Sequence, residues 1–93
     1  MKITFKKAPH QPFQLRYTDI KYQKKKIGYI KETENSYWKA LISVKKQPTE
    51  DDPACFRWVS FTKSFTTEAS VREYLLKNQE TIFNMYDIHQ FED

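Results

Sequence analysis

The clearest signal of secondary structure in the chain is the alternation in residues 37–44, which read YWKALISV. The apolar positions of this stretch share one side of an extended strand, and they are Trp38, Ala40, Ile42 and Val44. The opposite side is mixed and basic, and it continues one residue further to include Tyr37, Lys39, Leu41, Ser43 and Lys45. One apolar face and one polar face predict a strand of an antiparallel sheet with a core on one side.

Weaker alternation on either side of this stretch predicts further strands, at residues 1–7, 13–22, 27–30 and 56–62. Gly28 is the only glycine in the chain, and inside a strand it predicts either a bulge or the close approach of another backbone. In the last strand, Phe56 and Trp58 oppose Val59 and Phe61, so both faces are apolar. We therefore expect that strand to be central in the sheet.

The hydrophobic period changes from two to between three and four after residue 65, which predicts a helix. Thr66 or Thr67 is a suitable N-cap, and Glu68 then lies in the first turn, where the helix dipole favours an acid. The apolar stripe continues through Ile82 and Met85, but residues 82–88 also alternate as a strand would. We expect the helix to span about 66–78, followed by a strand or irregular segment over 81–89.

These elements predict an α+β fold in one domain, 1–93, with an antiparallel sheet of four to five strands and one main helix on one face. Ninety-three residues fit a single small domain. The expected core comprises Ile3, Phe5, Leu15, Trp38, Ala40, Ile42, Val44, Val59, Phe61, Val71 and Leu75.

Charge is divided unevenly along the chain. Residues 1–46 contain twelve basic and three acidic side chains, a net charge of +9, whereas residues 47–93 carry −5. Such asymmetry is typical of a protein with an anionic partner. It is equally compatible with a fold in which the acidic half partly neutralises the basic half.

Catalytic chemistry has little support in the sequence, so we expect a protein that is not an enzyme and has no cofactor or metal. His10 and His89 lack a third ligand at metal spacing, and Cys55 would be a nucleophile only beside a positioned base that no motif supplies. The carboxylates of residues 50–52 lie in a proline-bounded loop, where a solvated turn is the usual role.

Binding is better supported, because the basic strand face and the flanking turns combine lysines with aromatic residues. Lysine and arginine neutralise phosphates, and exposed aromatic rings stack on bases, so DNA or RNA is the leading partner. The candidate nucleic-acid-binding residues are Lys24, Lys25, Lys26, Lys31, Tyr37, Lys39, Ser43, Lys45, Lys46 and Arg57.

Residues 27–76 run from a glycine-containing strand, through a strand bearing Trp38 and Ala40, to a strand ending in Ser64-Phe65 and a helix that starts in Thr66-Thr67-Glu68-Ala69. This order resembles the DNA-binding domain of phage and transposon tyrosine recombinases, a three-stranded sheet followed by a helix. The resemblance implies that the outer sheet face lies in the major groove. The positions that would then touch DNA are Tyr37, Lys39, Leu41, Ser43 and Arg57.

The chain departs from that family in its long acidic loop at residues 47–53 and in its extra N-terminal strands. No recombinase catalytic domain follows, so we expect no integrase activity.

The alternative role is a protein-interaction or inhibitory module of a phage or other mobile element. The chain resembles such modules in being small, rich in aromatic residues and divided into a basic and an acidic half. If the protein inhibits a partner by mimicking nucleic acid, the residues that contact that partner would be the acidic ones, Glu50, Asp51, Asp52, Glu92 and Asp93. No apolar run is long enough for a membrane span, and the first residues lack a signal-peptide pattern. We expect a cytoplasmic monomer or homodimer with no membrane partner.

Overall fold

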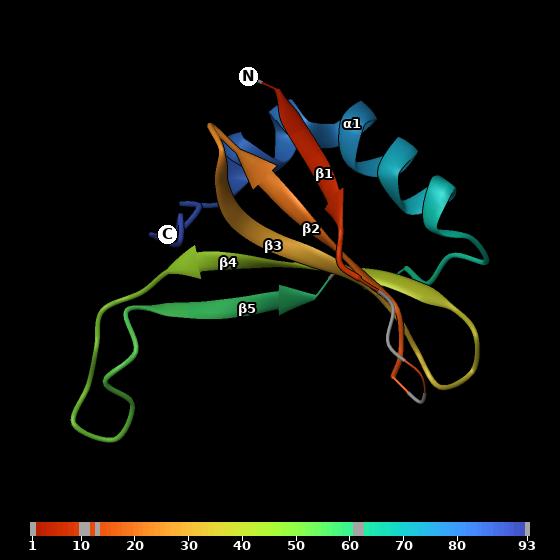
Figure 1. Ribbon diagram of the computed structural model, residues 1–93. Coiled ribbons are helices and arrows are strands. Elements are labelled where there is room, and N and C mark those ends of the chain that lie inside the picture. The colour runs from red at the N-terminus through yellow and green to blue at the C-terminus, as the bar shows by residue number, and fades with distance from the viewer. Residues whose placement is uncertain (1, 10–11, 13, 61–62, 93) are drawn as a thin grey trace.

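The computed structural model describes residues 2–9, 12, 14–60 and 63–92. Five strands form one antiparallel sheet in the order β1-β2-β3-β4-β5, and the helix α1 packs against one face of it (Figure 1). The elements are β1 (Ile3–Lys7), β2 (Tyr17–Tyr22), β3 (Lys25–Glu32), β4 (Trp38–Lys45), β5 (Phe56–Ser60) and α1 (Glu68–Met85). The α+β class, the antiparallel sheet and the single main helix are confirmed.

The helix begins where its capping residue predicts but ends seven residues later than expected. Thr67 is the N-cap, and its side-chain oxygen accepts a hydrogen bond from the Ser70 N–H. The predicted stop near Asn78 is wrong because Ile82 continues the buried stripe, so the helix gains apolar burial by extending to Met85. Strand-like backbone returns only in the short segment after it, where Ile88 forms an isolated bridge with Val44.

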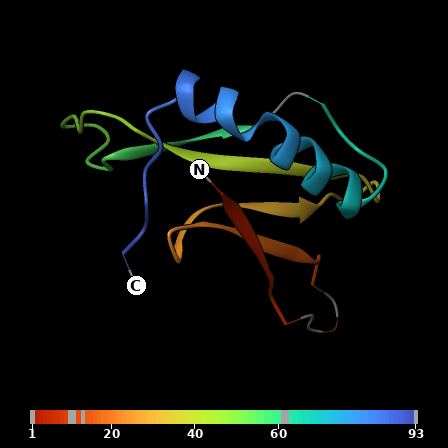
Figure 2. The ribbon, with the colours of Figure 1, turned by 90° about the horizontal axis from the view of Figure 1, so that it is seen from above.

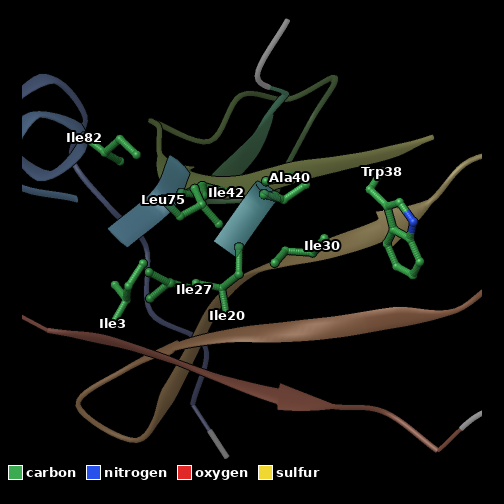
Figure 3. Packing of buried hydrophobic residues seen from close by; sticks show 10 residues of the cluster. Ile3, Ile20, Ile27, Ile30, Trp38, Ala40, Ile42, Leu75 and Ile82 are labelled. Atoms are coloured by element: carbon green, nitrogen blue, oxygen red, sulfur yellow. The ribbon is translucent and has the colours of Figure 1, made fainter. Parts of the chain in front are cut away.

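The core lies between α1 and the sheet face that it covers. Ile20, Ile27 and Ile30 on the sheet are fully buried and point toward Leu75 of the helix (Figure 3). The expected core residues that are buried are Ile3, Trp38, Ala40, Ile42, Val44, Val71 and Leu75. Two more, Phe5 and Val59, are half-buried, and Phe61 lies outside the described residues.

Leu15 does not belong to the core, contrary to prediction. Its alternation with Tyr17 suggested a strand from residue 13, but β2 begins only at Tyr17. Leu15 precedes the sheet and leaves half of its surface in solvent, at 50 % exposure. Leu15 and the exposed Tyr17 both lie on the side of the sheet that faces away from α1.

Gly28 lies both beside a β-bulge and against a closely approaching backbone, the two alternatives predicted for a glycine inside a strand. The pairing of β2 with β3 shifts register between Ile20 and Lys21, which leaves Ile27 as an extra residue whose side chain is buried. On the other side, β4 lies so close that a Cβ on Gly28 would overlap the carbonyl oxygen of Leu41. A residue with a side chain would therefore push β3 and β4 apart.

The predicted central position of the last strand is wrong, because β5 is an edge of the sheet. The apolar residues on both of its faces have a different cause. Val59 is half-buried on the helix side, whereas Phe56 and Trp58 pack on the other side against aromatic residues that follow α1. Both faces are partly covered, but one of them by a segment from the end of the chain.

Candidate nucleic-acid interface

The side of the sheet opposite α1, called the open face from here on, carries the side chains that alternate with the core. Because Ile30 and Ala40 are buried under the helix, their neighbours in β3 and β4 point away from it. These neighbours are Tyr29 and Lys31 on β3, and Lys39 and Leu41 on β4. Two of the predicted binding residues, Lys31 and Lys39, therefore share one surface.

Lys31 and Lys39 lie directly opposite each other in the pairing of β3 with β4. On its other side, Lys31 is paired with Tyr17 of β2. Directly opposed like charges destabilise a sheet, since their Cβ atoms are about 4.5–5.5 Å apart. Neither lysine forms an ion pair with any residue that the structure describes. The fold thus leaves a local concentration of positive charge that it does not itself neutralise.

Further along the sheet from this lysine pair, starting at Tyr29, five rings form an aromatic cluster, namely Tyr29, Phe56, Trp58, His89 and Phe91. The edge of Tyr29 meets Trp58 with ring centroids 5.0 Å apart, and Phe91 stacks on Trp58 at 5.6 Å. His89 stacks on Phe56 at 4.8 Å. Trp58 is still 39 % exposed, so part of a large aromatic surface remains free on the open face.

Two members of the aromatic cluster come from the segment after α1, which passes between the end of β4 and the start of β3 (Figure 2). The Lys45 N–H donates to the Asp87 carbonyl (2.8 Å), and the His89 N–H donates to that of Ser43 (3.0 Å). The Phe91 N–H then donates to the Lys26 carbonyl of β3 (2.9 Å). The segment therefore links the ends of β3 and β4 through backbone hydrogen bonds and an isolated β-bridge, between Val44 and Ile88.

Ser43 has to be withdrawn from the predicted binding residues. Its side chain is fully buried, at 0 % exposure, beneath that inserted segment. Its Oγ atom lies 2.9 Å from the carbonyl oxygen of Ile27 and 2.9 Å from that of His89, so the hydroxyl joins β3 to the inserted segment. Its serine hydroxyl has a structural role and does not face a ligand.

Arg57 is likewise misplaced in the predicted site. It is paired with Val44, and directly paired residues project from the same side of a sheet. Since Val44 is buried on the helix side, Arg57 also points to that side and away from the open face. The resemblance to the recombinase domain placed it with Lys39, and the register separates the two.

Four of the other predicted lysines have acidic partners. Lys26 lies 3.3 Å from an Asp19 oxygen, and the remaining three pair with acids from the second half of the chain. These are Lys25 with Glu92 (3.0 Å), Lys45 with Asp87 (3.7 Å) and Lys46 with Asp52 (2.8 Å). The acidic half therefore partly neutralises the basic half at these positions, so their contribution to an anion site is smaller than that of Lys31 and Lys39.

The last pair also fixes the long loop before β5. Hydrogen bonding to Lys46, and then the Ala54 N–H, lowers the pKa of the Asp52 carboxyl below its ordinary value. The Asp52 N–H in turn donates a 3.0 Å hydrogen bond to Oγ1 of Thr49. The acidic loop is thus a self-contained turn tied to the end of β4.

The remaining two candidates lie in turns at opposite ends of the sheet. Lys24 occupies the hairpin between β2 and β3, and Tyr37 directly precedes β4 and is 47 % exposed. Each is accessible, but neither belongs to the centre of the open face.

Sequence reasoning missed the aromatic residues of the open face, including Tyr17, Tyr29, Trp58 and Phe91. The signal was present for Tyr29, which alternates with the buried Ile30 exactly as Lys31 does. For Phe91 no local pattern exists, because its position depends on an inserted segment that pairs with strands far away in the sequence.

The structure also brings Cys55 and His89 together, with Sγ 3.9 Å from Nε2. A catalytic pair would need a third group to orient the imidazole, but Nδ1 is buried and has no hydrogen-bond partner among the described residues. Within the described part of the chain, no three His, Cys, Asp or Glu side chains gather as a metal site would require.

Comparison with known proteins gives no match to a family model, a curated protein or a solved structure. None of the helical sequence that the structure describes is both long and apolar enough to cross a bilayer.

Proposed function

We propose that the protein binds single-stranded nucleic acid on its open face and that it is not an enzyme. The observation that carries this proposal is the directly opposed pair of Lys31 and Lys39, which forms no ion pair with the described residues and shares the open face with the exposed ring of Trp58. A sheet tolerates two facing lysines at a cost in stability, and an anionic ligand would offset that cost. Strand phosphates supply such anions in a row.

Unpaired bases suit the rest of this surface. Every base has a flat face that stacks on an aromatic ring, at about 1–3 kcal/mol per base, and a positively charged surface follows the backbone. The ring of Tyr29 lies two residues from Lys31 on the same face of β3, and the ring of Trp58 on β5 follows it at 5.0 Å. In a duplex the base faces are already stacked on one another, so they are not available to stack on an exposed aromatic ring of the protein.

The resemblance to the recombinase DNA-binding domain supports the same face but a different ligand, duplex DNA in the major groove. A small cytoplasmic accessory protein of a phage or other mobile element would fit either ligand. The strand type is therefore the decisive measurement.

The test is fluorescence anisotropy with labelled single-stranded DNA, single-stranded RNA and duplex DNA, at about 50 and about 200 mM salt. We expect single strands to bind more tightly, and affinity to fall roughly 7- to 50-fold between the two salt concentrations, as two to four phosphate contacts imply. Lys31→Glu and Lys39→Glu should each weaken binding by about tenfold or more.

A matched control is Lys77→Glu, which makes the same charge change at an exposed position on α1, away from the open face. It should leave affinity within about twofold of the original, because phosphates outside a Debye length of roughly 8–10 Å interact weakly. Equal losses in all three variants would mean non-specific attraction and would contradict the proposed face. Preferred binding of duplex DNA would favour the recombinase-like mode instead.

A protein partner is the second candidate, because β5 is a sheet edge that also carries the exposed Trp58. An extended peptide can add to such an edge through backbone hydrogen bonds. Binding of this kind would tolerate salt, and Lys31→Glu would not reduce it.

A further inference from the structure

A pocket opens on the open face at its β2 side, next to the lysine pair. It has a volume of about 290 Å³ and is lined by Leu15, Arg16, Tyr17, Lys26, Tyr29 and Lys31. Small-molecule sites occupy roughly 300–1,000 Å³, so this pocket has room for one small ring system and not for a longer stretch of polymer.

The walls of the pocket are apolar and aromatic, although they stand in solvent. Leu15 is 50 % exposed and Tyr17 is 44 % exposed. Neither side chain contributes to the core on the helix side, so core packing does not account for their apolar surface. Together with the ring of Tyr29, they offer a planar ligand two aromatic surfaces and one aliphatic surface.

Positive charge lies at the rim. Lys26 Nζ is 5.4 Å from the centre of the Tyr29 ring and is held there by Asp19 at 3.3 Å. Lys31 has no ion-pair partner among the described residues. Arg16 is already engaged, because its guanidinium bonds both carboxylate oxygens of Glu32, at 3.4 and 2.9 Å. Lys31 is therefore the group most available to an incoming anion.

We infer that this pocket holds a single unstacked base, with the phosphate of the same nucleotide on Lys31. The inference deepens the proposed function and rests on it, since the pocket lies beside the face on which the strand would run. The base would lie against Tyr17 and Tyr29, and Leu15 would cover its edge.

The larger pocket near the acidic loop is less suited to a nucleotide. It has a volume of about 500 Å³ and includes Lys45 and Lys46 among its lining residues. Both of those lysines are paired, with Asp87 and Asp52, and Cys55 and His89 supply the remaining chemistry.

The test is an NMR titration of the protein with adenosine 5′-monophosphate and uridine 5′-monophosphate, compared with ribose 5-phosphate, which has the same anion but no base. We expect both nucleotides to shift the Leu15 methyl resonances and the Tyr17, Tyr29 and Lys31 amide resonances. Ribose 5-phosphate should bind at least about fivefold more weakly, the fold-change that corresponds to the lower end of one stacking interaction.

The variant Tyr17→Ala should weaken nucleotide binding by a similar factor, whereas Tyr17→Phe should retain it. Leu76→Ala is the matched control, because Leu76 is about as exposed as Tyr17, at 43 %, but lies on α1 and outside the pocket. Equal shifts with ribose 5-phosphate would overturn the inference, since they would reveal a site for the anion alone.

The oligonucleotide experiment separates this inference from the proposed function. If single strands bind but Tyr17→Ala leaves their affinity and the nucleotide shifts unchanged, the pocket inference is wrong and the function stands. If nucleotides shift the pocket resonances but no oligonucleotide binds, the pocket stands as a nucleotide site and the proposed function is wrong. If neither ligand binds, both are wrong.

Discussion

Thr18 of β2 donates a 2.8 Å hydrogen bond from Oγ1 to Oε2 of Glu68 in the first turn of α1. Thr18 is buried, and Glu68 also pairs with Arg72 one turn further along the helix. One side chain of the sheet thus holds the N-terminal end of the helix in place, fifty residues away in the sequence.

Thr18→Val should therefore destabilise the fold by about 1–3 kcal/mol, because it keeps the shape of the side chain but leaves the half-buried Glu68 oxygen without its donor. Thr18→Ser is the control that restores a hydroxyl and should recover most of the loss. Urea denaturation of the three proteins measures the difference. Equal stability of Thr18→Val and the original would show that the hydrogen bond contributes nothing net.

Ser43→Ala should also cost about 1–3 kcal/mol, since two carbonyl oxygens, those of Ile27 and His89, lose their shared hydroxyl donor. The buried position implies that nucleic-acid affinity of the folded variant stays unchanged. Denaturation and anisotropy on the same preparation check both statements. A variant of full stability but reduced affinity would return Ser43 to the binding surface.

The β2–β3 hairpin offers a stabilising change. Gln23 and Lys24 form its turn with φ of 54° and 66°, a left-handed conformation that glycine and asparagine adopt more easily. Lys24→Gly should raise stability by about 0.5–1 kcal/mol, whereas Lys24→Ala removes the same charge without that gain. Thermal melting distinguishes them. If alanine stabilises as much as glycine, relief of charge repulsion is the cause and backbone strain is not.

The acidic loop should respond to pH through Asp52. Its pKa is lowered in the folded protein, so the ionised form contributes stability above the ordinary pKa of about 3.9. This contribution is lost as the pH falls through the lowered folded value. Lys46→Met should return the Asp52 pKa toward its ordinary range, as measured by NMR titration of the carboxyl carbon. An unchanged pKa in that variant would assign the shift to the Ala54 N–H.

Local patterns were sufficient for much of the fold, because the alternation around Trp38 and the cap at Thr67 depend only on neighbouring residues. Burial was misjudged where it depends on register. Leu15 alternates with Tyr17, but the pairing of Tyr17 with Lys31 places that side of β2 on the open face. Arg57 is turned to the helix side by its pairing with Val44. Of the candidate site, Lys31 and Lys39 share the open face, whereas their direct opposition follows from the strand register, which sequence alone does not specify.

The aromatic cluster could not be predicted from the sequence. Phe91 meets Trp58 only because the segment after α1 is inserted between β3 and β4. The alternation in residues 82–88 is typical of extended backbone, but it does not indicate which strands such a segment pairs with. The same segment explains why β5, an edge strand, has apolar residues on both faces.

That insertion has a consequence for the order of folding. The hairpins of β2 with β3 and of β3 with β4 join residues close in the sequence, so they can form early. The hydrogen bond from the Phe91 N–H to the Lys26 carbonyl closes a loop of more than sixty residues, which costs chain entropy. The segment has no strands to pair with until both hairpins have formed, so this cost is not offset before then. We expect residues 87–91 to be unstructured in the folding transition state, and their substitutions to accelerate unfolding while leaving the folding rate nearly unchanged.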